Sequence, residues 1–175
     1  MFAYALRMGV AKENPCSRIV LPERQESEKK IFTIEETQAF LDALDGEPLR
    51  YVVFFVLAIF GGYRREELLG FEFRDFNFTT NVVTVERVSL YDPAHGIFTG
   101  PPKTARSHRS LKLPVWIFDM VKALRAEQSM RRMELGDQWH ESGRLFTKLD
   151  GSPARPGDFY DWGKELCERH GLPWY

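Results

Sequence analysis

Apolar residues recur at helical spacing along much of the chain, so the predicted structure is mostly α-helical. Thr33 and Glu36 form the capping-box pattern that starts the second predicted helix. The third, from Tyr51 to Phe60, is apolar on nearly all sides, and we expect it at the centre of the core. The predicted helices span residues 2–11, 34–44, 48–60, 64–69, 114–134 and 157–169.

Three short segments carry the β-branched or alternating pattern of strands, at residues 81–88, 96–99 and 110–113. We expect them to form one small three-stranded antiparallel β-sheet. The predicted fold class is therefore α+β, mostly α-helical. The polar stretch at residues 23–31 has no apolar period and is typical of a linker.

Composition is that of an ordinary globular protein. The chain has 175 residues, of which 43% are apolar and 28% charged, enough for one core with a small appendage. No apolar run reaches the length needed to cross a bilayer. Cys16 and Cys167 are the only cysteines, which argues against a disulfide framework and favours a cytoplasmic location.

The net charge of −1 argues against a strongly basic nucleic-acid-binding protein. Residues 101–112 nevertheless contain four cationic side chains and no acidic one. A local patch of this kind can neutralise phosphates on a chain of neutral total charge. It is equally compatible with an ordinary solvated surface.

The most informative stretch is residues 62–70, which follows the apolar helix and reads Gly-Tyr-Arg-Arg-Glu-Glu-Leu-Leu-Gly. A core helix that stops at glycine and then presents Arg64 would hold that arginine rigidly and aim it outward. A guanidinium is a charged fork that suits a phosphate or a carboxylate. Glu67 lies three residues on and can orient it. Taken alone, Arg64 is also consistent with a structural ion pair, and Lys103 with a solvated turn lysine.

Three sequence motifs follow one another along the chain. The first, G-x-R-x-x-E-L-L-G with an aromatic-x-D phrase behind it, spans residues 62–75. The second, P-K-T-x-x-S-x-R with an apolar strand behind it, spans residues 102–113. The third spans residues 145–172 and has a Leu-Phe strand, a Gly-x-Pro turn and a helix ending in H-G-L. Together they resemble the catalytic domain of tyrosine recombinases, the phage-integrase type of enzyme, over residues 30–175.

This resemblance implies the DNA breaking-rejoining enzyme fold and an activity in site-specific DNA recombination or integration. Strands would be cleaved and rejoined through a 3′-phosphotyrosyl intermediate, without a metal ion or other cofactor. The implied partners are double-stranded DNA and, for the complete protein, three further copies in a tetramer on DNA.

The resemblance also implies roles for individual residues. Arg64 would be the first catalytic arginine and Glu67 its acidic partner, while Lys103 would be the β-hairpin lysine that protonates the leaving 5′ oxygen. Contacts to DNA would come from four further side chains, Arg65, Thr104, Arg106 and Arg109.

The chain departs from the family pattern near its last residue. The family places an H-x-x-R motif and later the nucleophilic tyrosine downstream, but His170 has no arginine three residues on, and Tyr175 is the last residue. We therefore expect an inactive fragment of the catalytic domain. The expected domains are a remnant of the core DNA-binding (SAM-like) domain at residues 1–22, a linker at 23–31, and the N-terminal part of the catalytic domain at 32–175.

Two other functions fit the same residues. The chain can be a non-catalytic DNA-binding or regulatory module, which would bind DNA in a salt-dependent way without cleaving it. It can also be a helical domain that contacts another protein and has no affinity for DNA.

Overall fold

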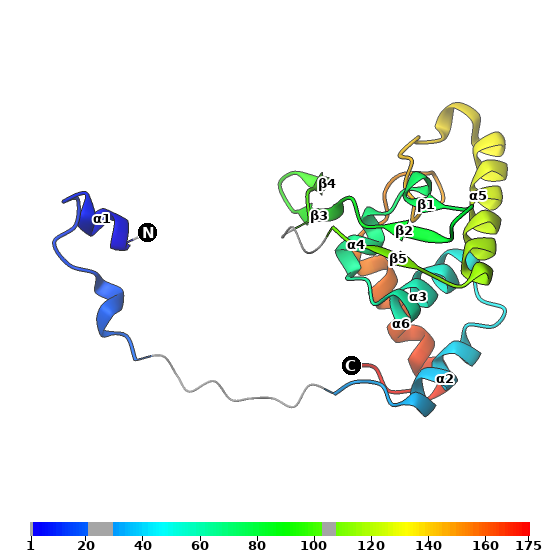
Figure 1. Cartoon of the computed structure of the whole chain (residues 1–175), viewed down its shortest axis with the longest axis horizontal. Coiled ribbons are helices and arrows are strands. Elements are labelled where there is room, and N and C mark those ends of the chain that lie inside the picture. Colours follow the sequence, from blue (N-terminus) through cyan, green and yellow to red (C-terminus); the bar gives the residue numbers. More distant parts are fainter. Residues whose placement is uncertain (1, 21–29, 103–107) are drawn as a thin grey trace. The chain divides into compact units, whose positions relative to one another are not determined.

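The chain divides into two compact units in the computed structural model, Met1–Ile31 and Phe32–Tyr175 (Figure 1). The structure describes residues 2–20, 30–102 and 108–175. In the first unit α1 spans Phe2–Arg7 and a 3-10 turn, η1, spans Pro15–Arg18. The helix is shorter than the predicted 2–11, because Gly9 takes a positive φ of 69° that ends regular helix geometry.

The second unit begins with three helices that confirm the predicted ones to within a residue or two. α2 spans Ile34–Ala43 and starts at the predicted capping box, where the Thr33 Oγ1 accepts the Glu36 amide at 3.1 Å. α3 spans Leu49–Gly61 and ends where Gly62 adopts the left-handed conformation. α4 spans Arg65–Gly70. Two longer helices follow later in the chain, α5 at Val115–Leu135, with a 3-10 turn, η4, at Gly136–Gln138, and α6 at Pro156–His170.

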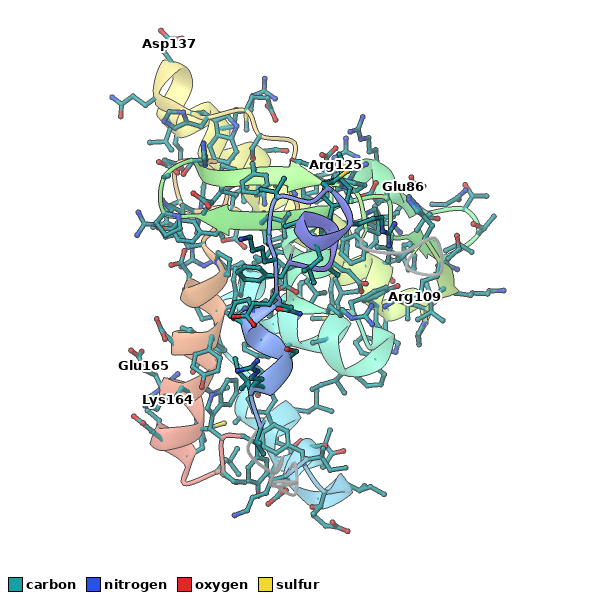
Figure 2. All side chains as sticks on the ribbon, turned by 90° about the vertical axis from the view of Figure 1, so that its left-hand side faces the viewer. Glu86, Arg109, Arg125, Asp137, Lys164 and Glu165 are labelled. Carbon is teal, nitrogen blue, oxygen red and sulfur yellow. The ribbon has the colours of Figure 1, made fainter. Side chains whose placement is uncertain are left out.

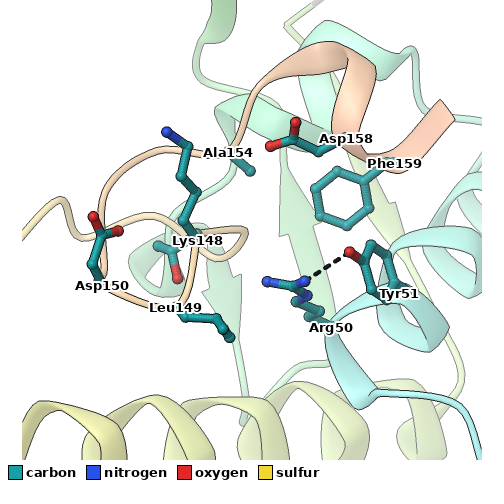
Figure 3. A pocket seen from close by; sticks show the side chains of 9 residues that line it. Arg50, Tyr51, Lys148, Leu149, Asp150, Ala154, Asp158 and Phe159 are labelled. Carbon is teal, nitrogen blue, oxygen red and sulfur yellow. Dashed lines mark hydrogen bonds between the residues drawn. The ribbon is translucent and has the colours of Figure 1, made fainter. Parts of the chain in front are cut away.

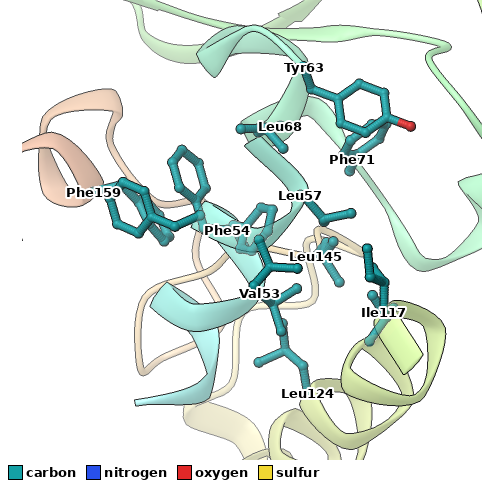
Figure 4. Packing of buried hydrophobic residues seen from close by; sticks show 14 of the residues in the cluster. Val53, Phe54, Leu57, Tyr63, Leu68, Phe71, Ile117, Leu124, Leu145 and Phe159 are labelled. Carbon is teal, nitrogen blue, oxygen red and sulfur yellow. The ribbon is translucent and has the colours of Figure 1, made fainter. Parts of the chain in front are cut away.

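The core is built around α3, as its apolar sequence predicts. Val53 and Leu57 are fully buried, and Ile117 of α5 packs in the same cluster (Figure 4). On the other side of α3 the rings of Phe54 and Phe159, which belongs to α6, stack with centroids 4.1 Å apart. Helix α3 thus packs between α5 and α6.

The sheets differ in part from the prediction. A short 3-10 turn, η2 (Phe73–Asp75), leads into β1 (Phe76–Asn77). β2 spans Val82–Thr84 and β5 spans Ser110–Lys112. The three strands form an antiparallel sheet in the order β1-β2-β5. The predicted strand at 96–99 is not part of it. It forms β4 (Gly96–Gly100), which pairs with β3 (Val88–Asp92) in a separate two-stranded hairpin.

The predicted strand 81–88 is broken because Arg87 turns away from the ladder to bind carboxylates. Its Nη1 donates to Asp75 Oδ2 at 2.6 Å, and its Nε lies 3.6 Å from Glu72 Oε1. A second arginine, the buried Arg144, donates to the Leu69 carbonyl at 2.9 Å and to the Thr99 hydroxyl at 2.6 Å. These two arginines therefore attach the β3-β4 hairpin to the end of α4. No helix in the described part of the chain is both long and apolar enough to cross a membrane.

The close contact of α4 with the chain leading into β3 predicts a strong effect of Gly70→Ala. A Cβ at this position would lie 2.6 Å from the Arg87 carbonyl oxygen and 3.0 Å from Val88 Cα, both backbone atoms. We expect the free energy of unfolding to fall by about 1–3 kcal/mol in urea titrations, despite the helix preference of alanine. Gly157→Ala in the first turn of α6 is the matched control, since a Cβ at that position would lie 3.7 Å from Asp161 Oδ2, an ordinary contact distance. That variant should be neutral or slightly more stable; equal effects of the two substitutions would contradict the contact.

Candidate functional site

The junction between α3 and α4 exposes one side chain and buries its neighbour. Tyr63 is only 6% exposed and packs edge-on against Phe71. Arg64 precedes α4 in an extended conformation, and its side chain is 70% exposed. Because Tyr63 is fixed in the core and Gly62 makes the turn, Arg64 is directed outward from a rigid base, as its sequence context predicts.

The Glu67 carboxylate lies directly beneath Arg64. Its side chain is only 2% exposed. One oxygen accepts the backbone N–H of Arg64 at 2.9 Å, and the other accepts the Arg64 Nη1–H at 3.1 Å. The carboxylate therefore holds both the backbone and the guanidinium of Arg64.

A second arginine binds the same carboxylate from a distant part of the sequence. Arg109, just before β5 and labelled in Figure 2, donates from Nη1 to Glu67 Oε1 at 3.0 Å and from Nη2 to Oε2 at 2.8 Å. Its Nη2 also lies 3.3 Å from the Gly62 carbonyl oxygen, and its guanidinium lies over the Tyr63 ring at 5.4 Å. This paired geometry is the strongest form of arginine–carboxylate contact. The site is thus a carboxylate between two arginines, one mostly exposed and one 32% exposed.

The surroundings shift three ionisation equilibria. Burial of Glu67 acts to raise its pKa, but hydrogen bonds from Arg109 and Arg64 together outweigh it, so the pKa lies below the usual value of 4.5. The pKa of Arg109 is raised, chiefly by its hydrogen bonds to Glu67. Burial raises the pKa of Tyr63 to about 12, so its hydroxyl stays protonated. The Tyr63 hydroxyl has no hydrogen-bond partner among the described residues.

The structure places four of the seven residues singled out from the sequence. Arg64, Glu67 and Arg109 meet in one cluster, and Arg65 lies beside it, half exposed and 3.4 Å from Glu66. Lys103, Thr104 and Arg106 lie outside the described residues. In the described ranges no group of three or more His, Cys, Asp or Glu side chains gathers as metal ligands would.

The Arg109–Glu67 contact was not predicted, although the S-x-R phrase that contains Arg109 was recognised. The two residues are 42 positions apart, so no helical or strand periodicity connects them. The available signal was charge: Glu67 lies on a helix face next to buried leucines, and a buried carboxylate requires cationic partners.

Glu67→Gln should destabilise the chain in a pH-dependent way. The folded-state pKa of Glu67 lies below 4.5, so the ionised carboxylate stabilises the folded chain above that pH, and this contribution is lost as the pH falls through the folded-state pKa. At neutral pH we expect the substitution to lower the free energy of unfolding by about 1–3 kcal/mol. The difference from the unmodified chain should shrink below pH 4.5.

Urea titrations at several pH values between about 3 and 7 would measure the free energy of unfolding of Glu67→Gln and of the unmodified chain. Glu168→Gln is the control, because that exposed glutamate pairs with Lys164 at 3.7 Å across one helical turn. Its effect should stay below about 0.5 kcal/mol. A pH-independent loss of stability in Glu67→Gln would show that the charge of the carboxylate is not what stabilises the site.

Comparison with known proteins finds relatives of one kind, although no family model matches the chain. A tyrosine recombinase XerC-like protein from Caldanaerobacter subterraneus subsp. tengcongensis is 29% identical over 190 residues, which covers 99% of the chain and 48% of the relative. The ICEBs1 integrase of Bacillus subtilis is 22% identical over 172 residues, covering 98% and 46%. The chain therefore spans about half the length of the curated relatives it matches.

Solved structures agree with these relatives in fold. The Tn1549 transposon integrase, in complex with a circular intermediate DNA, superposes with a TM-score of 0.74 at 18% identity, over 97% of this chain and 54% of that one. A λ integrase tetramer bound to a Holliday junction gives a TM-score of 0.58 at 15% identity, over 99% and 43%. The fold comparison confirms the predicted fold class. The chain is similar in sequence to a tyrosine recombinase XerC-like protein and to an integrase, and it shares its fold with about half of the solved Tn1549 integrase.

Proposed function

We propose that the chain acts in site-specific DNA recombination or integration, as the part of a tyrosine recombinase that holds the phosphate undergoing strand transfer. The observation that carries the proposal is the Arg64 guanidinium, exposed to solvent while its backbone and one of its nitrogens are fixed by Glu67. A cation held in this way before the substrate arrives does not have to reorganise as charge builds up on the phosphate.

The residues of the proposed active site have distinct roles. Arg64 keeps donors on the solvent side and binds a non-bridging oxygen of the phosphate. Glu67 is a positioning residue, since it is buried and contacts the arginines rather than solvent. Lys103 is proposed as the general acid on the resemblance alone, because it lies outside the described residues. The nucleophile would be a tyrosine that forms the 3′-phosphotyrosyl link.

The proposed partner is double-stranded DNA, contacted near the cluster by Arg65 and Arg109 and, on the resemblance, by Thr104 and Arg106. The related integrases solved in DNA complexes support this partner, and the λ integrase tetramer supports a tetrameric assembly for the complete protein. We propose that this reaction takes place in the cytoplasm.

We also propose that the two compact units correspond to different parts of a recombinase. Residues 1–22 would belong to the DNA-binding (SAM-like) domain, 23–31 to a linker, and 32–175 to the catalytic domain. The division of the chain at Ile31 and Phe32 supports this assignment.

Arg64→Gln should weaken binding of the chain to double-stranded DNA and reduce its dependence on salt. Loss of one phosphate contact lowers the slope of log affinity against log salt concentration by about 0.9. Fluorescence anisotropy over a range of salt concentrations measures both quantities. In a complete recombinase that contains this chain, strand cleavage should fall by about 10²–10³-fold, the usual effect of removing one preorganised donor.

Arg132→Gln is the matched control. Arg132 is also an exposed arginine paired with one glutamate, Glu141, but it lies on α5. We expect that variant to bind DNA with unchanged affinity and slope. An equal loss of DNA affinity in both variants would mean that Arg64 contributes only to the overall electrostatic field of the protein. The proposed function would then lose its main support.

A further inference from the structure

The buried side chain of Arg144 joins two elements that lead to the proposed phosphate site. Its Nη1 donates to the Leu69 carbonyl, in the last turn of α4, and its Nη2 donates to the Thr99 hydroxyl of β4. These acceptors lie 75 and 45 positions away in the sequence. One side chain thus connects the end of α4 to the end of β4, and Figure 1 shows the β3-β4 hairpin beside α4.

The backbone of Arg144 is fixed on the same side of the molecule. Arg144 and Glu72 form an isolated antiparallel bridge, and the amide of the next residue, Leu145, donates to the Phe71 carbonyl at 2.8 Å. The Leu145 side chain is fully buried. The guanidinium of Arg144 therefore projects from a rigid base, and at 6% exposed it is covered by protein.

The hydrogen-bond acceptors of Arg144 are both neutral, which is an unfavourable way to bury a cation. No carboxylate of the described residues lies within the 4.0 Å of an ion pair with it. Burial lowers the pKa of Arg144, because desolvation disfavours the charged form. An apolar side chain would avoid this cost, but it would not link the two acceptors. The specific contribution of the arginine is its planar fork of donors, which sets both acceptors in one geometry.

The segment 100–108 is attached to α4 on both sides. Before it, Thr99 is tied to the end of α4 through Arg144, and after it, Arg109 binds the carboxylate in the first turn of α4. The helix has six residues and is about 9 Å long. Lys103 follows Thr99 by four positions, so their Cα atoms are at most about 14 Å apart. The point at which the chain leaves β4 therefore limits where Lys103 can act.

We propose that Arg144 is a positioning residue for strand cleavage. Through Thr99 it holds the end of β4 on α4, so that the general acid on the chain that follows reaches the phosphate bound by Arg64. This inference rests on the proposed function, including the assignment of Lys103 as the acid. Arg144 itself is buried and contacts neither the DNA nor the reacting atoms.

The leaving group of the reaction offers a direct test of this role. In the proposed cleavage, the bond from the tyrosine oxygen to phosphorus forms as the bond from phosphorus to the 5′ oxygen breaks. The 5′ oxygen takes a proton from the general acid, and the phenolic proton passes to solvent. A 5′ sulfur leaves as a thiolate without a proton, because a thiol has a pKa of about 8.5. A defect confined to the acid should therefore disappear when sulfur replaces that oxygen.

Thr99→Val removes the acceptor hydroxyl at an exposed position, where the substitution leaves the core intact. In a complete recombinase that contains this chain, we expect the variant to cleave its DNA site about 10–100-fold more slowly. With sulfur in place of the leaving 5′ oxygen, cleavage should return to within about threefold of the unmodified protein. Fluorescence anisotropy should show an unchanged affinity for DNA.

Two further variants define the contact. Arg144→Lys cannot span both acceptors with its single ammonium, and it should show the same selective loss with the oxygen leaving group. Thr99→Ser keeps the hydroxyl, and it should cleave both substrates at the unmodified rate.

Arg50→Lys is the matched control. Arg50 also donates to a hydroxyl, that of Tyr51 at 2.7 Å, but it lies in the first turn of α3, beside a cavity lined by Asp150 and Asp158 (Figure 3). Because α3 has 13 residues, about 20 Å separate its two ends, and Arg64 follows the far one. Both cleavage rates should stay unchanged in this control.

Hydrogen exchange on the chain alone tests the anchor without any reaction. Thr99→Val should raise the exchange rates of the β3 and β4 amides by about tenfold, whereas the amides of α3 should keep theirs. Thr99→Ser should leave both sets unchanged.

Equal slowing of the oxygen and sulfur substrates by Thr99→Val would overturn the inference, since the loss would then lie in folding or in phosphate binding. Unchanged cleavage of both substrates, or unchanged exchange in β4, would overturn it as well. Failure of the unmodified recombinase to cleave either substrate is a different result, which would overturn the proposed function and this inference with it.

Discussion

The buried carboxylate of Glu67 is the constraint on which the geometry of the candidate site depends. A carboxylate removed from water is strongly unfavourable unless cations and hydrogen-bond donors surround it. Here Arg109 supplies a paired contact, and Arg64 supplies its backbone amide and one guanidinium nitrogen. The same carboxylate therefore joins the start of α4 to the segment before β5. Neither arginine can move far without leaving the buried charge uncompensated, and Arg64 is consequently held in place before any ligand arrives.

Local sequence patterns were sufficient to predict the helices of the second unit. The Thr33–Glu36 capping box and the glycine after α3 fix helix ends through contacts within four residues, and the apolar sequence of α3 requires burial on all sides. Strand pairing is decided by distant residues instead. The segment 81–88 has a continuous β-branched pattern, yet it breaks because Arg87 binds Asp75 and Glu72. No property of the segment itself indicates that this arginine will leave the ladder, so the separate β3-β4 hairpin was missed.

The same distinction applies to the site. Arg64 and Glu67 are one helical turn apart, and their contact follows from spacing alone. The contact of Glu67 with Arg109 depends on how β5 passes the start of α4, which is a property of the whole fold.

The distribution of buried and exposed charge explains how a chain with a net charge of −1 can present cations to a polyanion. Net charge counts Arg64 and Glu67 as cancelling, but the arginine side chain is 70% exposed while the glutamate is 2% exposed. A phosphate approaching from solvent meets the guanidinium at contact distance and the carboxylate only behind it. Since the interaction of charges falls with distance and is screened by salt, the nearer cation dominates. The formal charge of the chain is therefore a poor guide to its partners, and the depth at which each acidic side chain lies decides which sign of charge a ligand encounters.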